Sequence, residues 1–164
     1  MKQDVHLVLK FQERHINMIN DELFMEEALK EAKLAELEDE VPVGAVIVLD
    51  GKIISRGHNT RKKDNQISHH AEINAIESAE SNLGYLPLFG AIIYVTLEPC
   101  PMCAYAIMES HIERVVYGTS DPNKGAITTL DIFNKSIGSK IEVCGNIKQE
   151  ECRDILKKFF KNKR

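Results

Sequence analysis

Hydrophobic and polar positions divide most of this chain into alternating helical and extended segments. From about Asp21 to Glu38 apolar residues recur at helical spacing, which predicts an amphipathic helix capped by Asn20 or Asp21. Residues 43–49 form a continuous apolar run of the kind found in buried strands. Asp50-Gly51 is a two-residue hairpin signal, and residues 52–56 are expected to return antiparallel to the first strand.

The rest of the chain continues the alternation. Further strands are predicted at 91–97, 114–118 and 141–144, and helices at 69–81, 101–111 and 149–161, with a short helical segment near 130–133 and a polar loop at 57–68. A hairpin followed by alternating helices and strands predicts the α/β class, with a five-stranded mixed sheet between two helical layers. In such sheets ligands bind beyond the carboxyl ends of the strands. The segment that begins at Pro99 lies at such an end.

Length and composition limit the classes of protein to which this chain can belong. A chain of 164 residues with 43% hydrophobic residues is long enough for one domain with a real core. No apolar run approaches the roughly 20 residues of a membrane span, and no secretory signal is apparent. Four cysteines, two of them closely spaced, fit a reducing cytoplasm better than a disulfide framework.

The charge is unevenly distributed, although the net charge is only −4. Residues 1–40 hold eleven acidic and five basic residues, whereas residues 155–164 hold five basic residues and no acidic one. A basic tail on an acidic body is suited to contact a phosphate backbone. A solvated helix end whose lysines complement the helix dipole is an equally good interpretation.

Two short motifs carry the candidate chemistry. His70-Ala71-Glu72 opens one predicted helix, and Cys100 and Cys103 lie three residues apart at the start of another, around Pro101. Zinc accepts nitrogen and sulfur ligands, and a catalytic zinc site keeps three protein ligands and one open position. His70, Cys100 and Cys103 therefore predict a zinc site, with both sulfurs near a helix N-terminus that favours thiolates.

Glu72 indicates the type of reaction. Two positions beyond His70, it need not bind the metal and stays within reach of a zinc-activated water. A carboxylate in that place is suited to move protons between the water and a leaving group. The order H-x-E followed by P-C-x-x-C is the signature of zinc-dependent nucleobase deaminases. The alternative is a closed structural zinc site with a fourth ligand elsewhere in the chain.

From about Glu22 onward, the chain resembles the bacterial tRNA-specific adenosine deaminases. The segments that carry the resemblance are residues 40–45 (EVPVGA), 58–59 (HN), 70–72 (HAE), 94–100 (YVTLEPC), 115–118 (VVYG) and 159–160 (FF). The resemblance implies a three-layer α/β/α cytidine-deaminase-like fold, one Zn²⁺ per subunit, and a homodimer. It also implies conversion of the first anticodon adenosine of a tRNA to inosine, with tRNA-Arg (ACG) as the expected substrate. Residues 1–19 remain an extension of unknown role before a deaminase domain at 20–164.

Several further residues are candidate contacts. The resemblance assigns Asn59 to substrate reading, although asparagine is common in turns for local reasons. The backbone N–H of Ala71, at a helix tip, is placed to meet a purine atom. Candidate RNA contacts are Asp121, Lys124, Phe159 and Phe160, and we expect one phenylalanine to pack and the other to stack on a base.

The remaining histidine and cysteine candidates have plainer interpretations. His69 competes with His70 for the metal, but the spacing to Glu72 favours His70. Cys144 and Cys152 lack zinc spacing and are expected to be buried small hydrophobes.

Two other functions remain open. A deaminase of a free nucleoside, nucleotide or base, of cytidine, dCMP or guanine type, would use the same zinc chemistry without the basic tail. A non-catalytic zinc module would release no ammonia from any substrate, and the presence of Glu72 disfavours it.

Overall fold

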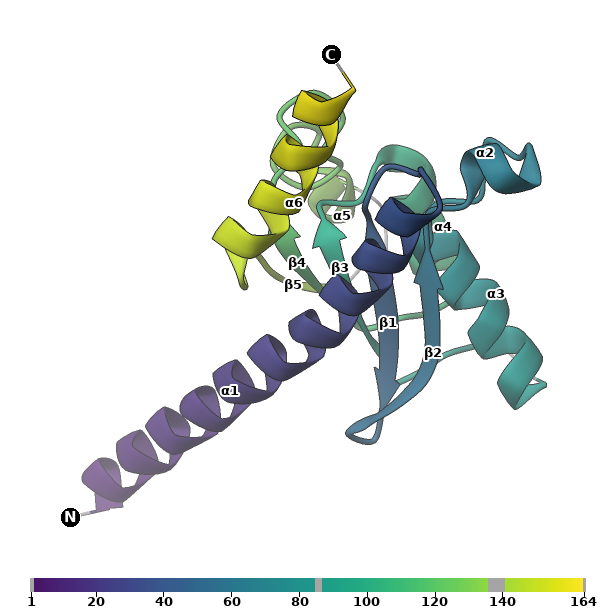
Figure 1. Ribbon diagram of the computed structural model, residues 1–164. Helices are drawn as coiled ribbons and strands as arrows, with labels where there is room; N and C mark the ends of the chain where they lie inside the picture. Colours follow the sequence, from purple (N-terminus) through teal and green to yellow (C-terminus); the bar gives the residue numbers. More distant parts are fainter. Residues whose placement is uncertain (1, 85–86, 136–140, 164) are drawn as a thin grey trace.

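In the computed structural model, the chain is a mixed β-sheet flanked by helices (Figure 1). The structure describes the backbone of residues 2–84, 87–135 and 141–163, and side chains within residues 20–84, 87–134 and 141–163. The strands are β1 (Gly44–Leu49), β2 (Lys52–His58), β3 (Ile92–Leu97), β4 (Arg114–Thr119) and β5 (Glu142–Cys144). The helices are α1 (Lys2–Leu37), α2 (Arg61–Asp64), α3 (Ala71–Leu83), α4 (Pro101–Glu109), α5 (Ile132–Lys135) and α6 (Gln149–Asn162).

The sheet has the order β2-β1-β3-β4-β5. β1 pairs antiparallel with β2 and with β3, whereas β3, β4 and β5 run parallel. Asp50 and Gly51 both have positive φ, 51° and 72°, which is the conformation that a tight hairpin of this kind requires. The predicted hairpin and the predicted five-stranded mixed sheet are therefore confirmed.

Helices cover both faces of the sheet, with α3, α4 and α5 on one side and α1 and α6 on the other (Figure 1). Alternate residues of β1 explain this division. Ala45 and Ile47 belong to the core cluster beneath α3 and α4, while Val46 and Val48 pack against α1 and α6. All four side chains are buried, so β1 has apolar residues on both faces. The predicted three-layer arrangement is confirmed.

The predicted start of the first helix is wrong. α1 begins at Lys2, so Asn20 and Asp21 lie inside the helix and cap nothing. Asp21 is buried, and its two carboxylate oxygens accept hydrogen bonds from the guanidinium of Arg114 at 2.7 and 2.8 Å. The hydroxyl of Tyr94 donates to the same carboxylate at 2.8 Å. Asp21 therefore joins α1 to the sheet.

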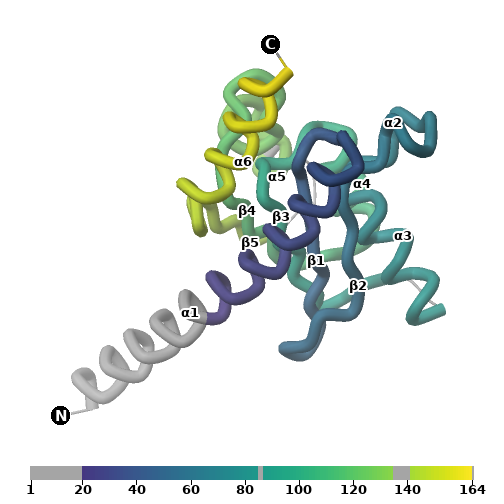
Figure 2. The backbone as a smooth tube through the Cα atoms, in the orientation of Figure 1, coloured from purple at the N-terminus to yellow at the C-terminus, as the bar shows by residue number. Residues whose placement is uncertain are grey.

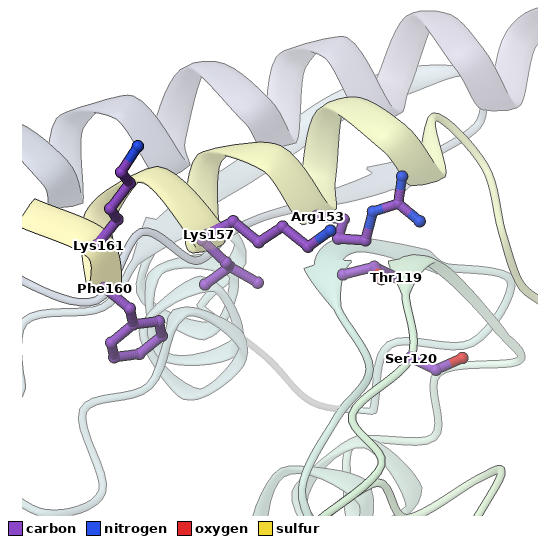
Figure 3. Close-up of a pocket in the computed structure, with 7 residues that line it drawn as sticks. Thr119, Ser120, Arg153, Lys157, Phe160 and Lys161 are labelled. Atoms are coloured by element: carbon purple, nitrogen blue, oxygen red, sulfur yellow. The ribbon is translucent and has the colours of Figure 1, made fainter.

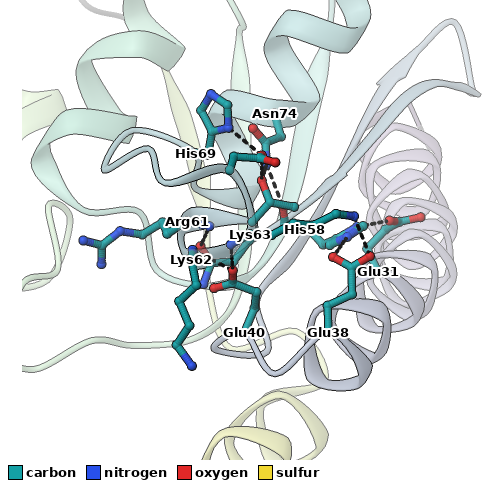
Figure 4. A network of polar contacts seen from close by, with 12 residues as sticks. Glu31, Glu38, Glu40, His58, Arg61, Lys62, Lys63, His69 and Asn74 are labelled. Carbon is teal, nitrogen blue, oxygen red and sulfur yellow. Dashed lines mark hydrogen bonds and ion pairs between the residues drawn. The ribbon is translucent and has the colours of Figure 1, made fainter.

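The polar segment predicted as a loop contains regular structure. β2 continues to His58, and the short helix α2 follows after two residues. Figure 4 shows the contacts that hold this segment against the end of α1. The carboxylate of Glu40 accepts the backbone N–H groups of Lys62 and Lys63 at 2.6 and 2.8 Å, which satisfies two orphan donors at the start of α2. Figure 2 traces the backbone path through this region to α3.

No helix among the described residues combines the length and the apolar character needed to cross a membrane.

Candidate active site

The start of α3 presents His70. This residue is the N-cap of the helix, with extended backbone angles of −76° and 159°, and its carbonyl accepts the first helical N–H from Asn74 at 3.0 Å. The imidazole makes no capping hydrogen bond, so it is available to a ligand. The Asn74 amide donates to the carbonyl of His58 at 2.7 Å and to the hydroxyl of Thr60 at 2.9 Å. These contacts fix the backbone on both sides of Asn59.

The start of α4 presents the two cysteines. Cys100 is the N-cap and Pro101 follows in the first turn, where its missing N–H leaves no bond unmade. Nδ1 of His70 lies 3.6 Å from Sγ of Cys100 and 3.5 Å from Sγ of Cys103. Cys103 is fully buried and Cys100 is half-buried. The fold thus brings His70 to two cysteines that lie 30 and 33 positions further along the chain, at two adjacent helix tips.

This donor set fits zinc. The nitrogen and the two sulfurs all lie within 4.8 Å of one another, as the ligands of a single ion must. Contacts with the Cys103 thiol and the His70 imidazole lower the pKa of Cys100 to about 4, whereas the contact with Cys100 and burial raise the pKa of Cys103. Three protein ligands leave a fourth position free, which is typical of a catalytic rather than a structural zinc site.

The neighbouring His69 does not belong to this cluster. Its Nδ1 lies 2.7 Å from a carboxylate oxygen of Asp64, at the end of α2 (Figure 4). His70, not His69, therefore lies at the two cysteines, and its role as the zinc ligand stays a prediction.

Glu72 lies in the first turn of α3 and is 3% exposed. It lines the same cavity as His70 and Cys100 but is outside the metal-ligand cluster. Burial of its side chain raises the pKa of Glu72 to about 7. A carboxyl group that titrates near neutrality is suited both to accept and to return a proton.

The cavity beside the cysteines has a volume of about 430 Å³. It is lined by Val41, Val43, Asn59, Arg61, His70, Ala71, Glu72, Leu97, Glu98, Cys100, Ser120, Asp121, Pro122, Asn123, Lys124, Leu156 and Phe160. Most of the predicted site residues therefore surround one space, and the loop at 121–124 and helix α6 form part of its wall.

Asn59 is 6% exposed at the cavity wall. Its amide donates to the carbonyl of Val41 at 3.2 Å and accepts the N–H of Arg61 at 3.4 Å. Both contacts are long, so the amide is held weakly by its own backbone surroundings. These contacts support the interpretation that Asn59 stabilises the local turn. Because Asn59 also lines the cavity, its role in substrate recognition stays a prediction.

The two phenylalanines of α6 differ in burial, so the expected packing of one of them is confirmed and the base contact of the other stays a prediction. Phe159 is 7% exposed, and the ammonium of Lys163 lies 5.4 Å from the centre of its ring. Phe160 is 50% exposed and lines the cavity. Burial leaves Phe159 no free face for a base, so Phe160 is the aromatic candidate for contact with RNA.

Cys144 and Cys152 were both predicted to be buried, and the prediction is confirmed for one of them. Cys152, on the face of α6 that packs on the sheet, is fully buried, whereas Cys144 is only half-buried.

Comparison with known proteins places this site in a family. Residues 18–119 match the profile described as the cytidine and deoxycytidylate deaminase zinc-binding region. A tRNA-specific adenosine deaminase of Bacillus subtilis is 46% identical over 149 residues, which cover 90% of this chain and 92% of the relative. This chain belongs to the tRNA-specific adenosine deaminase family. A second relative with the same description, from Agrobacterium fabrum, is 44% identical over 143 residues, which cover 86% of this chain and 94% of the relative.

Solved structures agree with this assignment. A structure from a study of A-to-I editing by tRNA:A34 deaminases matches with a TM-score of 0.79 and 44% identity, covering 81% of this chain and 98% of the other. A guanine deaminase of Bacillus subtilis matches less completely, with a TM-score of 0.58 and 38% identity over 60% of this chain and 64% of the other. The zinc-binding deaminase fold of this family member is thus well supported.

Sequence reasoning missed Glu98 in this deaminase. The residue is 2% exposed, and its carboxylate accepts the backbone N–H groups of Asp121, Ile127 and Thr128 at 2.8, 2.9 and 2.6 Å. The Thr128 hydroxyl lies 3.0 and 2.8 Å from its two oxygens. Glu98 therefore fixes the loop that carries Lys124 at the cavity. The available signal was a carboxylate at the end of a buried strand, which requires partners inside the protein.

Proposed function

We propose that this chain hydrolyses the 6-amino group of adenosine at the first anticodon position of a tRNA, giving inosine. One observation carries the proposal: the buried Glu72 lies beside the His70, Cys100 and Cys103 cluster and lines a cavity of about 430 Å³. Membership of the tRNA-specific adenosine deaminase family supports the same substrate. We further propose tRNA-Arg with an ACG anticodon as the tRNA.

His70, Cys100 and Cys103 would hold the ion. Bound zinc supplies Lewis acidity, which lowers the pKa of a water molecule to about 7. The Glu72 carboxylate takes a proton from the attacking water and delivers it to N1 of the adenine. The oxygen that adds to C6 still carries one proton, and Glu72 moves this proton to the departing amino group, so that a C6 carbonyl forms, the C6–N6 bond breaks and ammonia leaves. Water and adenosine are thereby converted to ammonia and inosine.

The cavity walls provide the substrate contacts in this proposal. Asn59 and the backbone N–H of Ala71 would meet the ribose or the purine edge, because both residues line the cavity next to His70. Because adenosine must leave its stack to enter, an exposed ring at the mouth is useful, and Phe160 provides one. Asp121 and Lys124 line the loop side of the same cavity and would contact the nucleotides beside the target.

A free-base deaminase is the competing function, favoured by the partial similarity to a guanine deaminase. Purified zinc-loaded protein should be incubated with a tRNA-Arg (ACG) transcript and, separately, with adenosine, cytidine and guanine. We expect inosine at the first anticodon position and no ammonia from the small molecules. Turnover of guanine or a nucleoside with the tRNA unchanged would overturn the proposed substrate and retain the zinc site.

The assembly and location are also proposals. The family resemblance implies a homodimer, and the combination of free cysteines and a tRNA substrate favours the cytoplasm. The molar mass in solution, measured by light scattering at several concentrations, tests the dimer directly.

A further inference from the structure

One wall of the catalytic cavity is a short irregular segment between β2 and α2. Asn59 and Arg61 line the cavity from this side, and Thr60 lies between them. Another part of the wall comes from α6, from which the ring of Phe160 projects (Figure 3). Phe160 is carried by a regular helix, whereas residues 59 and 60 belong to no helix or strand. Their position therefore depends on contacts with other elements.

Asn74, in the first turn of α3, supplies such contacts. Its side-chain NH₂ group donates to the carbonyl of His58 at 2.7 Å and to the hydroxyl of Thr60 at 2.9 Å (Figure 4). His58 and Thr60 are the two chain neighbours of Asn59, so one amide bridges the segment on both sides of it. Both bonds are shorter than the 3.2 and 3.4 Å contacts of the Asn59 side chain itself.

The groups at both ends of this bridge are themselves held. The Thr60 hydroxyl donates to the Asp64 carboxylate at 2.6 Å, so its lone pairs remain available to accept from Asn74. The backbone N–H of Asn74 donates to the carbonyl of His70 at 3.0 Å. Asn74 thus joins the segment that carries Asn59 to the helical turn that begins at His70.

A comparable bond lies further along the same helix. The side-chain amide of Asn82, two turns after Asn74, donates to the carbonyl of Ile54 in β2 at 3.0 Å. Both asparagines therefore join α3 to the edge strand of the sheet. Neither Asn82 nor Ile54 is among the described residues that line the cavity. The Asn82 bond serves only the packing of α3, and it provides a matched control for Asn74.

We propose that Asn74 is a positioning residue for the substrate, which acts by fixing the direction in which the Asn59 amide faces the cavity. The proposal rests on the proposed function, in which Asn59 meets the ribose or the purine edge. Asn74 is not among the described residues that line the cavity, so its influence on the substrate passes through the segment that it bridges. An amide that is already oriented loses less freedom when it binds, which makes its hydrogen bond to the substrate stronger.

The test is a double-mutant cycle between positions 74 and 59. Asn74→Ala and the control Asn82→Ala are each made in the wild-type chain and in Asn59→Ala. Zinc-loaded proteins are assayed for inosine formation in tRNA-Arg (ACG), and zinc content and thermal unfolding are measured in the same samples. Asn74→Asp, which keeps the shape of the side chain but removes the NH₂ donor, is the second variant.

For Asn74→Ala and Asn74→Asp we expect kcat/KM to fall about tenfold in the wild-type chain, the size expected for one well-oriented hydrogen bond. In Asn59→Ala the same substitutions should change kcat/KM by less than about twofold, because the residue that they position is gone. Asn82→Ala should lower the melting temperature and leave kcat/KM unchanged. Equal losses of kcat/KM from the position-74 substitutions in the two backgrounds, or from Asn74→Ala and Asn82→Ala, would overturn the proposal.

Hydrogen exchange gives a readout that needs no substrate. The backbone N–H of Asn59 donates to the carbonyl of Val43 and that of Thr60 to the carbonyl of His69, both at 3.1 Å. Loss of the bridging amide should speed exchange at these two positions, whereas Asn82→Ala should not. Unchanged exchange at both positions in Asn74→Ala would show that Asn74 does not hold the segment.

The two proposals fail in different ways. If wild type leaves the tRNA unchanged but deaminates adenosine, cytidine or guanine, the proposed function is wrong, and the cycle measured on that substrate supports Asn74 or overturns it. If wild type forms inosine in the tRNA and the substitutions at positions 74 and 59 act independently, the function stands and the positioning role is wrong. An absence of turnover of all these substrates by wild type would overturn both.

Discussion

Gly125 packs directly against the carboxylate of Glu98. A Cβ built on Gly125 would lie 2.4 Å from the carboxyl carbon and from one of its oxygens, which no side chain allows. The close approach lets the loop wrap around the buried carboxylate, whose oxygens accept three backbone N–H groups from Asp121, Ile127 and Thr128. Glu98, two positions before Cys100, therefore holds the loop that forms the opposite wall of the cavity.

Glu98→Gln should loosen this loop. The glutamine places an NH₂ donor against backbone N–H donors, so buried groups lose partners and the free energy of unfolding should fall by about 1–3 kcal/mol. The KM for RNA should rise, because Lys124 and Asp121 are carried by the same loop. Thermal unfolding and editing kinetics measure the two effects.

Glu109→Gln on α4 is the matched control, since Glu109 is exposed. Gly125→Ala should act in the same direction as Glu98→Gln. Wild-type stability and KM in Glu98→Gln would show that the carboxylate does not hold the loop.

Zinc removal should lower stability as well as activity. An ion that binds the folded chain alone adds about 4 kcal/mol when present at a thousand times its dissociation constant. Chelation should therefore lower the melting temperature, and added Zn²⁺ should restore it, whereas Mg²⁺, which prefers oxygen ligands, should not. Cys103→Ser should bind zinc weakly and respond little to chelator. A melting curve unchanged by complete zinc loss would contradict a site formed by His70, Cys100 and Cys103.

Asp21→Asn should destabilise the fold without changing the chemistry. The Asp21 carboxylate is bound by Arg114 and Tyr94, and its loss leaves a guanidinium without its main partner. We expect a decrease of about 2–3 kcal/mol in the free energy of unfolding. Glu77→Gln, at an exposed position of α3, is the control. kcat per folded, zinc-loaded molecule should stay at the wild-type value. A decrease in kcat without a loss of stability would place Asp21 in the catalytic machinery instead.

Periodicity predicted most of the secondary structure because its elements have clear apolar patterns. Strands β1 and β3 are nearly continuous apolar runs and β4 has an apolar centre, and the predicted bounds of all three differ from the structure by one residue at most. The start of α1 was missed because Asn20 and Asp21 are good capping residues locally. The role of Asp21 is a long-range pair with Arg114, which spacing along the chain cannot reveal.

The candidate site, like the secondary structure, could be predicted in part from the sequence. The ligands of one ion have a fixed chemistry, so His70, Cys100 and Cys103 were identifiable from residue type and spacing alone. The role of Glu98 was not, because it depends on which loops meet after folding.

The most direct test of the mechanism is inosine formation in tRNA-Arg (ACG) by wild type and Glu72→Gln, with zinc measured in the same samples. Loss of the proton-transfer group should lower kcat by at least about 100-fold, while the zinc content stays at one ion per subunit, because Glu72 is not in the ligand cluster. A Glu72→Gln protein that keeps its zinc and edits at the wild-type rate would contradict the account.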